Sequence, residues 1–334
     1  MSAGRLTRAL TEGLVRLPDA GRIAVLRPPV GMDLAALPAS RVDVVTGFRP
    51  DHDAWAAREV AVARAPSPPY AAAIVCLPRA RALAEALVAQ GAALAPDGPL
   101  ILDGQKADGV EALLRAAAGR APLGPPLSKG HGKLAVIDAP GAAFADWARA
   151  PGRTPSGFVT APGLFSADGP DPASAALGDA LPTTLTGRVA DLGAGWGYLS
   201  ARALAASPGI AEMHLIEAEH DALEAARANV TDPRARFHWA DARAFAPDLP
   251  FDAIIMNPPF HQGRAPDPTL GRAFIAAAAR MLARGGALWL VANRHLPYER
   301  ALAETFDAVD RLDGPPQVKL IRARAPRREE GTRR

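Results

Sequence analysis

The segment DLGAGWG, residues 191–197, constrains the fold of this chain more than any other stretch. It ends an apolar run that begins at residue 187, and it leads into WGYLSARALAAS, residues 196–207, which has the composition of a helix. A strand that passes through a glycine-rich turn into a helix is typical of an open α/β sheet. Gly193, Gly195 and Gly197 let the backbone turn tightly and let a ligand approach it, although loop geometry alone also favours glycine.

Short apolar runs alternate with Ala-, Leu- and Arg-rich stretches through the rest of the second half of the chain. This alternation predicts a parallel sheet whose strands are joined by helices. Besides residues 187–195, the expected strands are residues 212–218, 235–242, 251–260, 286–297 and 317–325, and the expected helices are residues 196–207, 220–230 and 270–282.

The first half shows the same alternation and is expected to form a second α/β domain. A length of 334 residues is typical of two domains. A Pro- and Gly-rich segment, residues 148–163, separates the halves, so we expect domains of residues 1–150 and 151–334. The expected strands of the first half are residues 22–28, 41–47, 71–77, 99–104 and 133–139, and its helices are residues 79–94 and 107–120.

A distant internal repeat relates the two halves. Both halves contain the order strand, helix, strand. In the first half the two strands are AAIVCLP and PLILDG, and in the second half they are AIIMNPP and GALWLVANRHLP. The chemistry does not match, because Leu77 stands where the second half has Asn257, and no glycine-rich loop follows a strand in the first half. If the halves are duplicates, the first has lost its catalytic residues.

Composition narrows the class of protein. One cysteine, Cys76, rules out an intrachain disulfide and a Cys-based zinc site. No uninterrupted apolar run reaches the 18 residues of a membrane span, and the N-terminus lacks the long apolar segment of a secretion signal, so we expect a cytoplasmic enzyme or binding protein. The net charge of +3 and the pI of about 9.3 permit an anionic partner. The arginine-rich end, from Arg322, is either a solvated tail or a nucleic-acid contact.

Acidic residues follow three successive predicted strands. Asp191 precedes the glycine loop, Glu217 ends the second strand and Asp241 ends the third. At the carboxyl edge of a parallel sheet, Glu217 can accept from the hydroxyls of a ribose and Asp241 from an amine such as that of adenine. The alternative roles are a charge at a helix N-terminus for Glu217 and a helix N-cap for Asp241. Together the three residues indicate an adenosine site.

S-adenosylmethionine fits this site better than a nicotinamide dinucleotide, although both contain adenosine. Dinucleotide sites favour a G-x-G-x-x-G loop, with the pyrophosphate at the helix N-terminus, whereas this loop is G-x-G-x-G. A carboxylate at Asp191 would repel a pyrophosphate. The same carboxylate would attract the sulfonium and α-amino groups of S-adenosylmethionine.

The segment NPPF, residues 257–260, closes the fourth predicted strand and has the chemistry to hold an amine. The side-chain carbonyl of Asn257 and the backbone carbonyl of Pro258 can each accept one N–H of an amino group, and Phe260 offers a face on which a base can stack. Two acceptors would favour a pyramidal nitrogen on a conjugated amine, which is otherwise a poor nucleophile. A rigid Pro-Pro turn is the structural alternative.

These motifs resemble the class I S-adenosylmethionine-dependent methyltransferases that act on exocyclic amines. Within that class the chain is similar to the small-subunit ribosomal RNA guanine-N2 methyltransferase C family, over about residues 157–325. A sister family that acts on large-subunit rRNA shares the NPPFH signature. The resemblance implies two tandem Rossmann-like domains, of which the N-terminal one is degenerate and does not bind the methyl donor. It is carried by residues 163–177, 257–263, 285–306 and 317–323.

The resemblance also assigns residues. It implies that Asp191 and the loop glycines hold the methionine part of the donor, that Glu217 binds ribose, and that Asp241 binds the adenine amine. Phe165 and Asp168 are candidates to close over the donor, with a solvated loop charge as the alternative for Asp168. The residues that would hold the guanine are Asn257, Pro258 and Phe260.

Residues after this motif are candidates for the substrate rim. Pro259, His261 and Arg264 are assigned to substrate binding, with an exposed turn as the alternative for His261 and a solvated arginine as the alternative for Arg264. A metal role for His261 is not expected, because no second ligand stands at a suitable spacing.

The sequence therefore predicts methyl transfer from S-adenosylmethionine to the N2 amine of a guanine in 16S rRNA. Naked rRNA and the assembled small subunit are both open as the partner, and a monomer is expected. The nearest alternatives are methylation of a large-subunit guanine N2, an adenine N6 or a glutamine N5. An alternative of another class is a non-catalytic RNA-binding protein for ribosome assembly.

Overall fold

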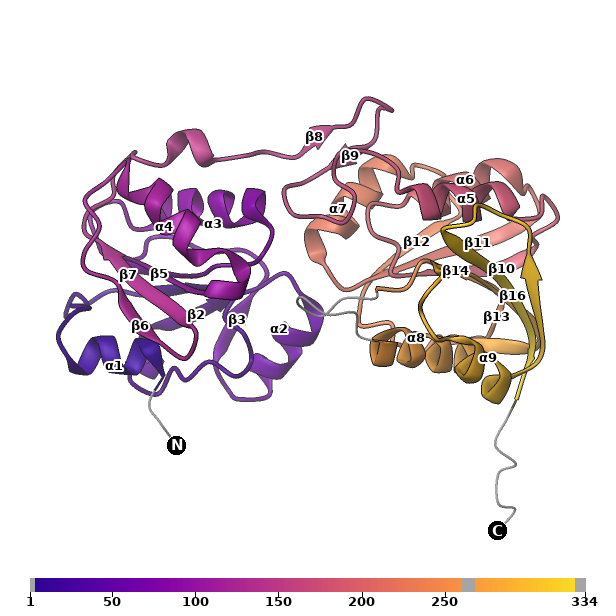
Figure 1. Cartoon of the computed structure of the whole chain (residues 1–334), viewed down its shortest axis with the longest axis horizontal. Helices are drawn as coiled ribbons and strands as arrows, with labels where there is room; N and C mark the ends of the chain where they lie inside the picture. The colour runs from indigo at the N-terminus through magenta and orange to yellow at the C-terminus, as the bar shows by residue number, and fades with distance from the viewer. Residues whose placement is uncertain (1–3, 260–267, 328–334) are drawn as a thin grey trace, which may run out of the picture. The chain divides into compact units, whose positions relative to one another are not determined.

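The computed structural model describes residues 4–259 and 268–327 (Figure 1). The chain divides into two compact units, residues 1–150 and 151–334. Each unit is a twisted sheet with helices on both faces, so the predicted α/β fold class with two Rossmann-like units is confirmed.

The first unit contains a seven-stranded sheet with the order β3-β2-β1-β4-β5-β7-β6. Strands β1 to β5 are parallel, and β7 runs antiparallel to both β5 and β6. The central strand β1 is buried along its whole length, as expected of a parallel strand covered on both faces. The strands are β1 (Ile23–Leu26), β2 (Val42–Val45), β3 (Ala61–Ala63), β4 (Ala72–Cys76), β5 (Leu100–Gln105), β6 (Leu127–Lys129) and β7 (Gly132–Ile137).

Helices cover the first sheet on both faces. Residues of α3 and α4, such as Val88 and Leu113, pack with Val75 on one face, and Leu6 of α1 and Trp55 of α2 pack on the other. The helices are α1 (Arg5–Thr11), α2 (Arg49–Ala56), α3 (Arg81–Leu94) and α4 (Val110–Ala118), with short 3-10 turns at Ala39–Arg41, Lys106–Asp108 and Ala145–Trp147.

The second unit has the same strand arrangement, in the order β12-β11-β10-β13-β14-β16-β15. Its five strands β10 to β14 are parallel, and β16 lies antiparallel between β14 and β15. The strands are β10 (Gly187–Leu192), β11 (Ile210–Glu217), β12 (Ala235–Trp239), β13 (Phe251–Met256), β14 (Leu282–Asn293), β15 (Phe306–Leu312) and β16 (Val318–Pro326), preceded by the small hairpin of β8 (Gly152–Arg153) and β9 (Val159–Thr160).

Two layers of helices enclose the second sheet. Helices α5, α6 and α7 lie on one face and α8 and α9 on the other (Figure 1), and each layer forms its own core cluster with the sheet. The helices are α5 (Pro172–Ala180), α6 (Tyr198–Ala206), α7 (His220–Asn229), α8 (Pro268–Met281) and α9 (Glu299–Thr305). In the described ranges, no helix combines the length and apolar character needed to span a bilayer.

Candidate active site

The carboxyl ends of β10, β11 and β13 meet at one edge of the second sheet. Strand β10 pairs with β11 on one side and with β13 on the other, all three in parallel. The side chains that follow these strands are therefore neighbours, although they are far apart in the sequence. This edge brings together Asp191, Glu217 and Asn257, three of the residues predicted to form the site.

The glycine loop between β10 and α6 requires glycine for two different reasons. Gly193, Gly195 and Gly197 all have positive φ angles, of 73°, 54° and 88°. At Gly197 a Cβ atom would also come within 2.8 Å of the Val230 side chain, whereas a Cβ at Gly195 would meet no atom within 4 Å. Packing therefore restricts Gly197, and the space beside Gly195 is open for a ligand.

Asp191 is a buried acid at the start of this loop. Its side chain is 1% exposed and accepts a hydrogen bond of 2.8 Å from the Ser200 hydroxyl on α6. The pKa of Asp191 is raised to about 7, chiefly by burial; the hydrogen bond from Ser200 opposes this shift, and the negative charge of Glu217 adds to it. Burial makes the ionised form of this carboxylate unfavourable, and a cation bound beside it would stabilise that form.

Glu217 is held by backbone amides at the end of β11. One carboxylate oxygen accepts from the amide of Gly195 at 2.8 Å, and the other accepts from the amide of Glu219 at 2.7 Å. Burial raises the pKa of Glu217, and these amide hydrogen bonds oppose that effect. The carboxylate is thus tied to the glycine loop and to the N-terminus of α7 at once, and its position is fixed before any ligand binds.

Asp241 makes the contacts of a turn-forming residue. Its carboxylate accepts from the Arg243 amide at 2.9 Å and from the Arg243 guanidinium at 2.7 Å. Its backbone carbonyl accepts from the amides of Ala244 and Phe245. No helix follows Asp241 in this described stretch, so the residue closes a turn and is not the helix N-cap expected as its alternative role. A ligand amine would share a carboxylate that already has an internal cation.

Asn257 follows β13 and is held by the first turn of α5. The Asn257 Nδ2 atom donates to Oδ2 of Asp171 at 3.1 Å and to Oγ of Ser174 at 2.9 Å. Asp171 is the N-cap of α5 and also accepts from the Ser174 amide at 2.8 Å. Of the residues following Asn257, Pro258 is buried and Pro259 is exposed.

A cavity of about 50 Å³ lies at this edge of the sheet. Its lining includes Asp191, Asn257 and the glycine loop, and the segment before α5 contributes Phe165 and Ser166. Phe165 is 57% exposed, and its backbone carbonyl accepts from the indole Nε1 of Trp196 at 3.0 Å, which holds this segment beside the loop. Asp168 is exposed and lies outside the lining of the cavity, as its solvated alternative requires.

Several supporting residues were not predicted. Ser200, Asp171 and Ser174 contact the site acids and amide, and Asn229 donates to the carbonyls of Trp196 and Val159, both at 2.8 Å. The cap signature D-P-A-S before an apolar run was the one available signal for Asp171 and Ser174.

Three of the predicted site residues, Phe260, His261 and Arg264, lie outside the described residues. Within the described ranges, no group of three or more His, Cys, Asp or Glu side chains is arranged as metal ligands would be.

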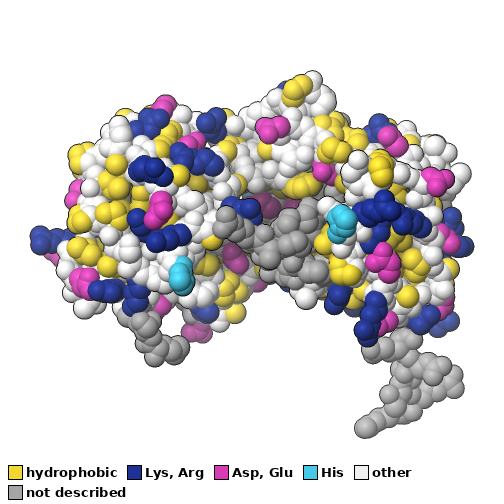
Figure 2. Space-filling model, viewed as in Figure 1, with side chains coloured by type: hydrophobic (Ala, Val, Ile, Leu, Met, Phe, Trp, Pro, Cys, Tyr) yellow, Lys and Arg dark blue, Asp and Glu magenta, His cyan; other side chains and the backbone are white. Residues whose placement is uncertain are grey.

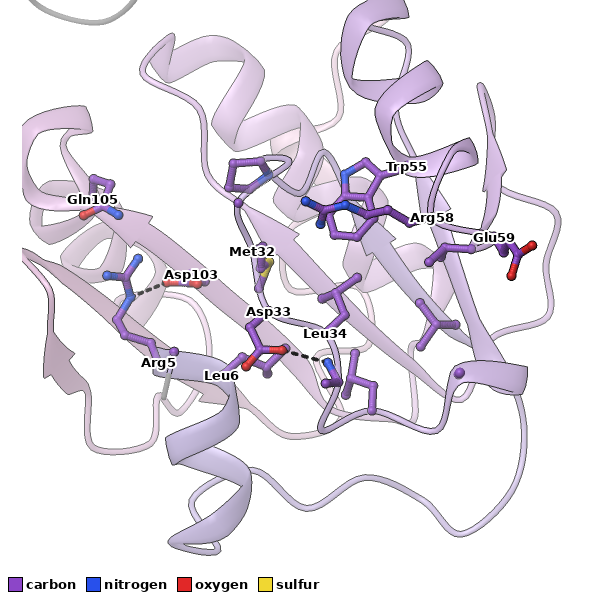
Figure 3. A pocket seen from close by; sticks show the side chains of 18 residues that line it. Arg5, Leu6, Met32, Asp33, Leu34, Trp55, Arg58, Glu59, Asp103 and Gln105 are labelled. Atoms are coloured by element: carbon purple, nitrogen blue, oxygen red, sulfur yellow. Dashed lines mark hydrogen bonds and ion pairs between the residues drawn. The ribbon is translucent and has the colours of Figure 1, made fainter. Parts of the chain in front are cut away.

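A larger groove, of about 940 Å³, lies in the first unit, and two of its polar side chains, Asp103 and Trp55, already have partners within the protein (Figure 3). Arg5 and Asp103 form an ion pair of 2.6 Å with side chains only 11% and 12% exposed. The indole Nε1 of Trp55 donates to the carbonyl of Pro28 at 3.1 Å. The volume of a cavity therefore does not identify the reactive site. The acids, amide and glycine loop that could bind a ligand together lie at the sheet edge of the second unit.

The fold and this edge define a methyltransferase of the class I type. Residues 156–322 match the family model described as "Methyltransferase small domain". The chain belongs to the ribosomal RNA small subunit methyltransferase C family, which confirms the resemblance drawn from its motifs.

The family assignment rests on similarity across both units. The chain is 33% identical over 249 residues to "Ribosomal RNA small subunit methyltransferase C" of Shewanella oneidensis, covering 71% of this chain and 72% of that protein. The protein of the same name from Salmonella arizonae is 36% identical over 169 residues, covering 49% of this chain and 48% of that one. A solved structure, the T. thermophilus 16S rRNA N2 G1207 methyltransferase (RsmC) in complex with AdoMet and guanosine, superposes with a TM-score of 0.77 at 25% identity, covering 96% of this chain and 92% of that one.

Proposed function

We propose that this enzyme transfers a methyl group from S-adenosylmethionine to the N2 amine of a guanine in 16S rRNA. The observation that carries the proposal is the arrangement of Asn257. Its amide nitrogen is engaged by Asp171 and Ser174, and no residue of the described ranges donates to its Oδ1. An acceptor oxygen is thereby held at the cavity, beside the buried acid and the glycine loop.

The residues at this edge fit the proposed donor. Asp191 is a buried carboxylate that favours a neighbouring cation, Gly195 leaves open space beside the loop, and Glu217 is fixed with free lone pairs for hydroxyl groups. The enclosed cavity accommodates only a small part of such a ligand, so its adenosine would lie along the open edge towards β11 and β12. Bound there, S-adenosylmethionine supplies a methyl group activated by a positive sulfonium.

The proposed role of Asn257 and Pro258 is to orient the accepting amine. The lone pair of an exocyclic guanine amine is delocalised into the ring, so the nitrogen is a weak nucleophile. Two carbonyl acceptors on its hydrogens favour a pyramidal nitrogen with its lone pair directed at the methyl group. Alignment of this kind contributes roughly 7–11 kcal/mol to catalysis. The methylated nitrogen is acidic and loses its extra proton to water, so the chain needs no strong base.

The substrate class follows from relatives. Two relatives are named for the small ribosomal subunit, and the structural neighbour was solved with guanosine, which favours a small-subunit guanine over large-subunit guanine, adenine or glutamine. The guanine must leave its stack to reach a recessed acceptor. On the face seen in Figure 2, Lys and Arg side chains are interspersed with Asp and Glu.

We extend the proposal to the two units. Residues 151–334 form the catalytic domain, and residues 1–150 serve as a degenerate domain that binds RNA or supports the structure. A monomer in the cytoplasm agrees with action on 16S rRNA or on the small subunit. A non-catalytic assembly protein is disfavoured, because it has no use for a buried acid, a fixed glutamate and an oriented amide at one sheet edge.

The test is to incubate the purified protein with radiolabelled S-adenosylmethionine and separated 16S rRNA, 23S rRNA, small subunits and large subunits. Digestion to nucleosides should place the label in N2-methylguanosine from 16S rRNA or small subunits. Label in 23S rRNA, in N6-methyladenosine or in protein would replace the proposed substrate by the corresponding alternative. Donor binding without label in any fraction would contradict the proposal as a whole.

A further inference from the structure

We propose that Asp171 and Ser174 are positioning residues that fix the orientation of the Asn257 amide. This inference rests on the proposed function, because it concerns which end of that amide faces the accepting amine. An asparagine side chain can present either its carbonyl oxygen or its NH2 group after a half-turn of the amide. Only the carbonyl orientation can accept an N–H from guanine.

The carboxylate of Asp171 decides between the two orientations. An ionised carboxylate has only acceptors, so the Asn257 atom at 3.1 Å from its Oδ2 must be the nitrogen. In the reversed orientation, the Asn257 oxygen would face the Asp171 oxygen at this distance, and two acceptors would repel each other. The Ser174 hydroxyl receives the second amide hydrogen at 2.9 Å. Both N–H bonds are thus used inside the protein, and Oδ1 is directed away from them.

The placement of these two residues is not explained by helix capping alone. Asp171 already caps α5 through the Ser174 amide, and Asn or Ser would cap about equally well. Ser174 is 8% exposed inside the first turn, where alanine would be the better helix former. The Asn257 amide, at the end of β13, explains both choices. Ser174 supplies a hydroxyl that accepts from this amide, and Asp171 supplies a group that can only accept from it.

The contact also makes Asn257 a better acceptor. A negative charge at the nitrogen end of an amide draws its N–H bonds towards the carboxylate and increases electron density on the carbonyl oxygen. Asp171 and Ser174 therefore act through Asn257 and need no contact with the substrate. Their loss should lower kcat and leave donor binding unchanged.

The decisive variant is Asp171→Asn, because it keeps the helix cap and removes the acceptor-only group. An asparagine at this position can satisfy Asn257 in either orientation. We expect kcat to fall by roughly 10–100-fold, the size typical of partners that orient a ligand, with the donor Kd within twofold and the melting temperature within about 2 °C of wild type. The matched control is Asp179→Asn, the same change at an exposed site of α5 paired with Arg202, which should leave kcat unchanged.

A double-mutant cycle with Asn257→Ala separates positioning from a general structural effect. If Asp171 acts through Asn257, adding Asp171→Asn to the Asn257→Ala variant should cause no further loss of kcat. A full additional 10–100-fold loss in that background would overturn the inference, and so would a single Asp171→Asn variant with wild-type kcat.

A spectroscopic measurement tests the inference without activity. The chain has three asparagines, Asn229, Asn257 and Asn293, so selective ¹⁵N-asparagine labelling gives three side-chain NH2 signals, and the Asn257→Ala variant assigns one of them. We expect slow hydrogen exchange at the Asn257 NH2 in wild type and at least tenfold faster exchange in Ser174→Ala or Asp171→Asn, with Asn229 unchanged. Fast exchange in wild type would overturn the inference. Slow exchange combined with no methylation of any rRNA would instead contradict the proposed function.

Discussion

The two units have the same strand order but opposite chemistry at the carboxyl edges of their sheets. In the second unit, β10 ends at Asp191 and Leu192 and enters a loop of three glycines. In the first unit, β1 is apolar and buried throughout and continues as Arg27, Pro28 and Pro29. The buried apolar runs that set the strand order are common to both units, whereas a few polar residues and glycines make one edge a site.

The helix before the first strand shows the contrast most directly. In the second unit, the N-terminus of α5 holds Asn257 and leaves its Oδ1 available at the cavity. In the first unit, the N-terminus of α1 supplies Arg5, whose guanidinium pairs with Asp103 and also donates to the Lys129 carbonyl at 2.8 Å. The same structural position therefore serves to orient an acceptor in one unit and to neutralise a buried acid in the other.

The sheet register changes one detail of the internal repeat. Val75 lies beside Leu26, the last residue of β1, and packs with the cluster of α3 and α4. Met256 packs on the corresponding side of the second sheet, with α8 and α9. Val75 is therefore the structural equivalent of Met256, and Cys76 is the equivalent of Asn257. The alignment of Asn257 with Leu77 expected from the sequence is wrong by one residue.

The largest expected effect is the loss of kcat in Asn257→Ala. Its control is Cys76→Ala, the equivalent change in the first unit. Removing Asn257 deletes one fixed acceptor for the amine, so we expect kcat to fall by about 10²–10³-fold, as for the loss of one oriented group in other active sites. The donor Kd should stay within twofold in calorimetry. Cys76→Ala should keep wild-type kcat. Equal loss of donor binding in Asn257→Ala would contradict the role assigned to Asn257.

The second effect concerns Asp191→Asn. Loss of a charged partner for the donor cation should weaken donor binding by on the order of 10–100-fold, because hydrogen bonds to charged groups contribute roughly 1.5–3 kcal/mol. The same change should raise the melting temperature of the donor-free protein at pH 8. The folded-state pKa of about 7 lies above the unfolded value of 3.8, so this carboxylate lowers stability progressively as the pH rises towards 7. Unchanged donor affinity in calorimetry would exclude Asp191 from the site.

The sequence predicted the strands of the central parallel sheets, and it missed short or exposed strands at the sheet edges. Strands β10, β11 and β13 were expected because buried parallel strands are continuous apolar runs. Strand β15, Phe306–Leu312, was missed, because it is an antiparallel edge strand that alternates exposed and half-buried residues after Phe306. Edge strands carry charged residues on their solvent face, so their sequences lack the signal of a core strand.

The site was predictable where a residue follows a strand directly, and less so where a contact joins distant segments. Asp191, Glu217 and Asn257 each follow or end a central strand, so their meeting at one edge could be inferred. The support of Asn257 by Asp171 joins residues 86 positions apart, and no local pattern encodes that distance. The pairing of Asp241 with Arg243 is local, but the sequence alone leaves open whether that carboxylate faces a ligand or its own loop.

A third, smaller effect is a pH dependence of donor binding. The donor cation favours the ionised form of Asp191, whose pKa burial raises to about 7. Below pH 7 binding must release a proton, so donor affinity should fall by up to about tenfold for each further pH unit and level off above pH 8. Calorimetry from pH 6 to 8.5 measures the change. Asp191→Asn should remove the dependence, and an identical slope in that variant would assign the titration to another group.

The smallest expected effect is that of Asp103→Asn in the first unit. Burial raises the pKa of Asp103 even though Arg5 opposes the shift, so the ionised carboxylate recovers only part of its desolvation cost from the ion pair. Asparagine keeps an acceptor for Arg5 without the charge, and Arg5 keeps its hydrogen bond to the Lys129 carbonyl. We therefore expect a stability change within about 1 kcal/mol, or roughly 2–4 °C in melting temperature, with kcat and donor Kd at wild-type values. A tenfold loss of kcat in an Asp103→Asn variant with a normal melting temperature would show that the groove of the first unit contributes to the reaction. That result would contradict the assignment of the reaction to the sheet edge of the second unit alone.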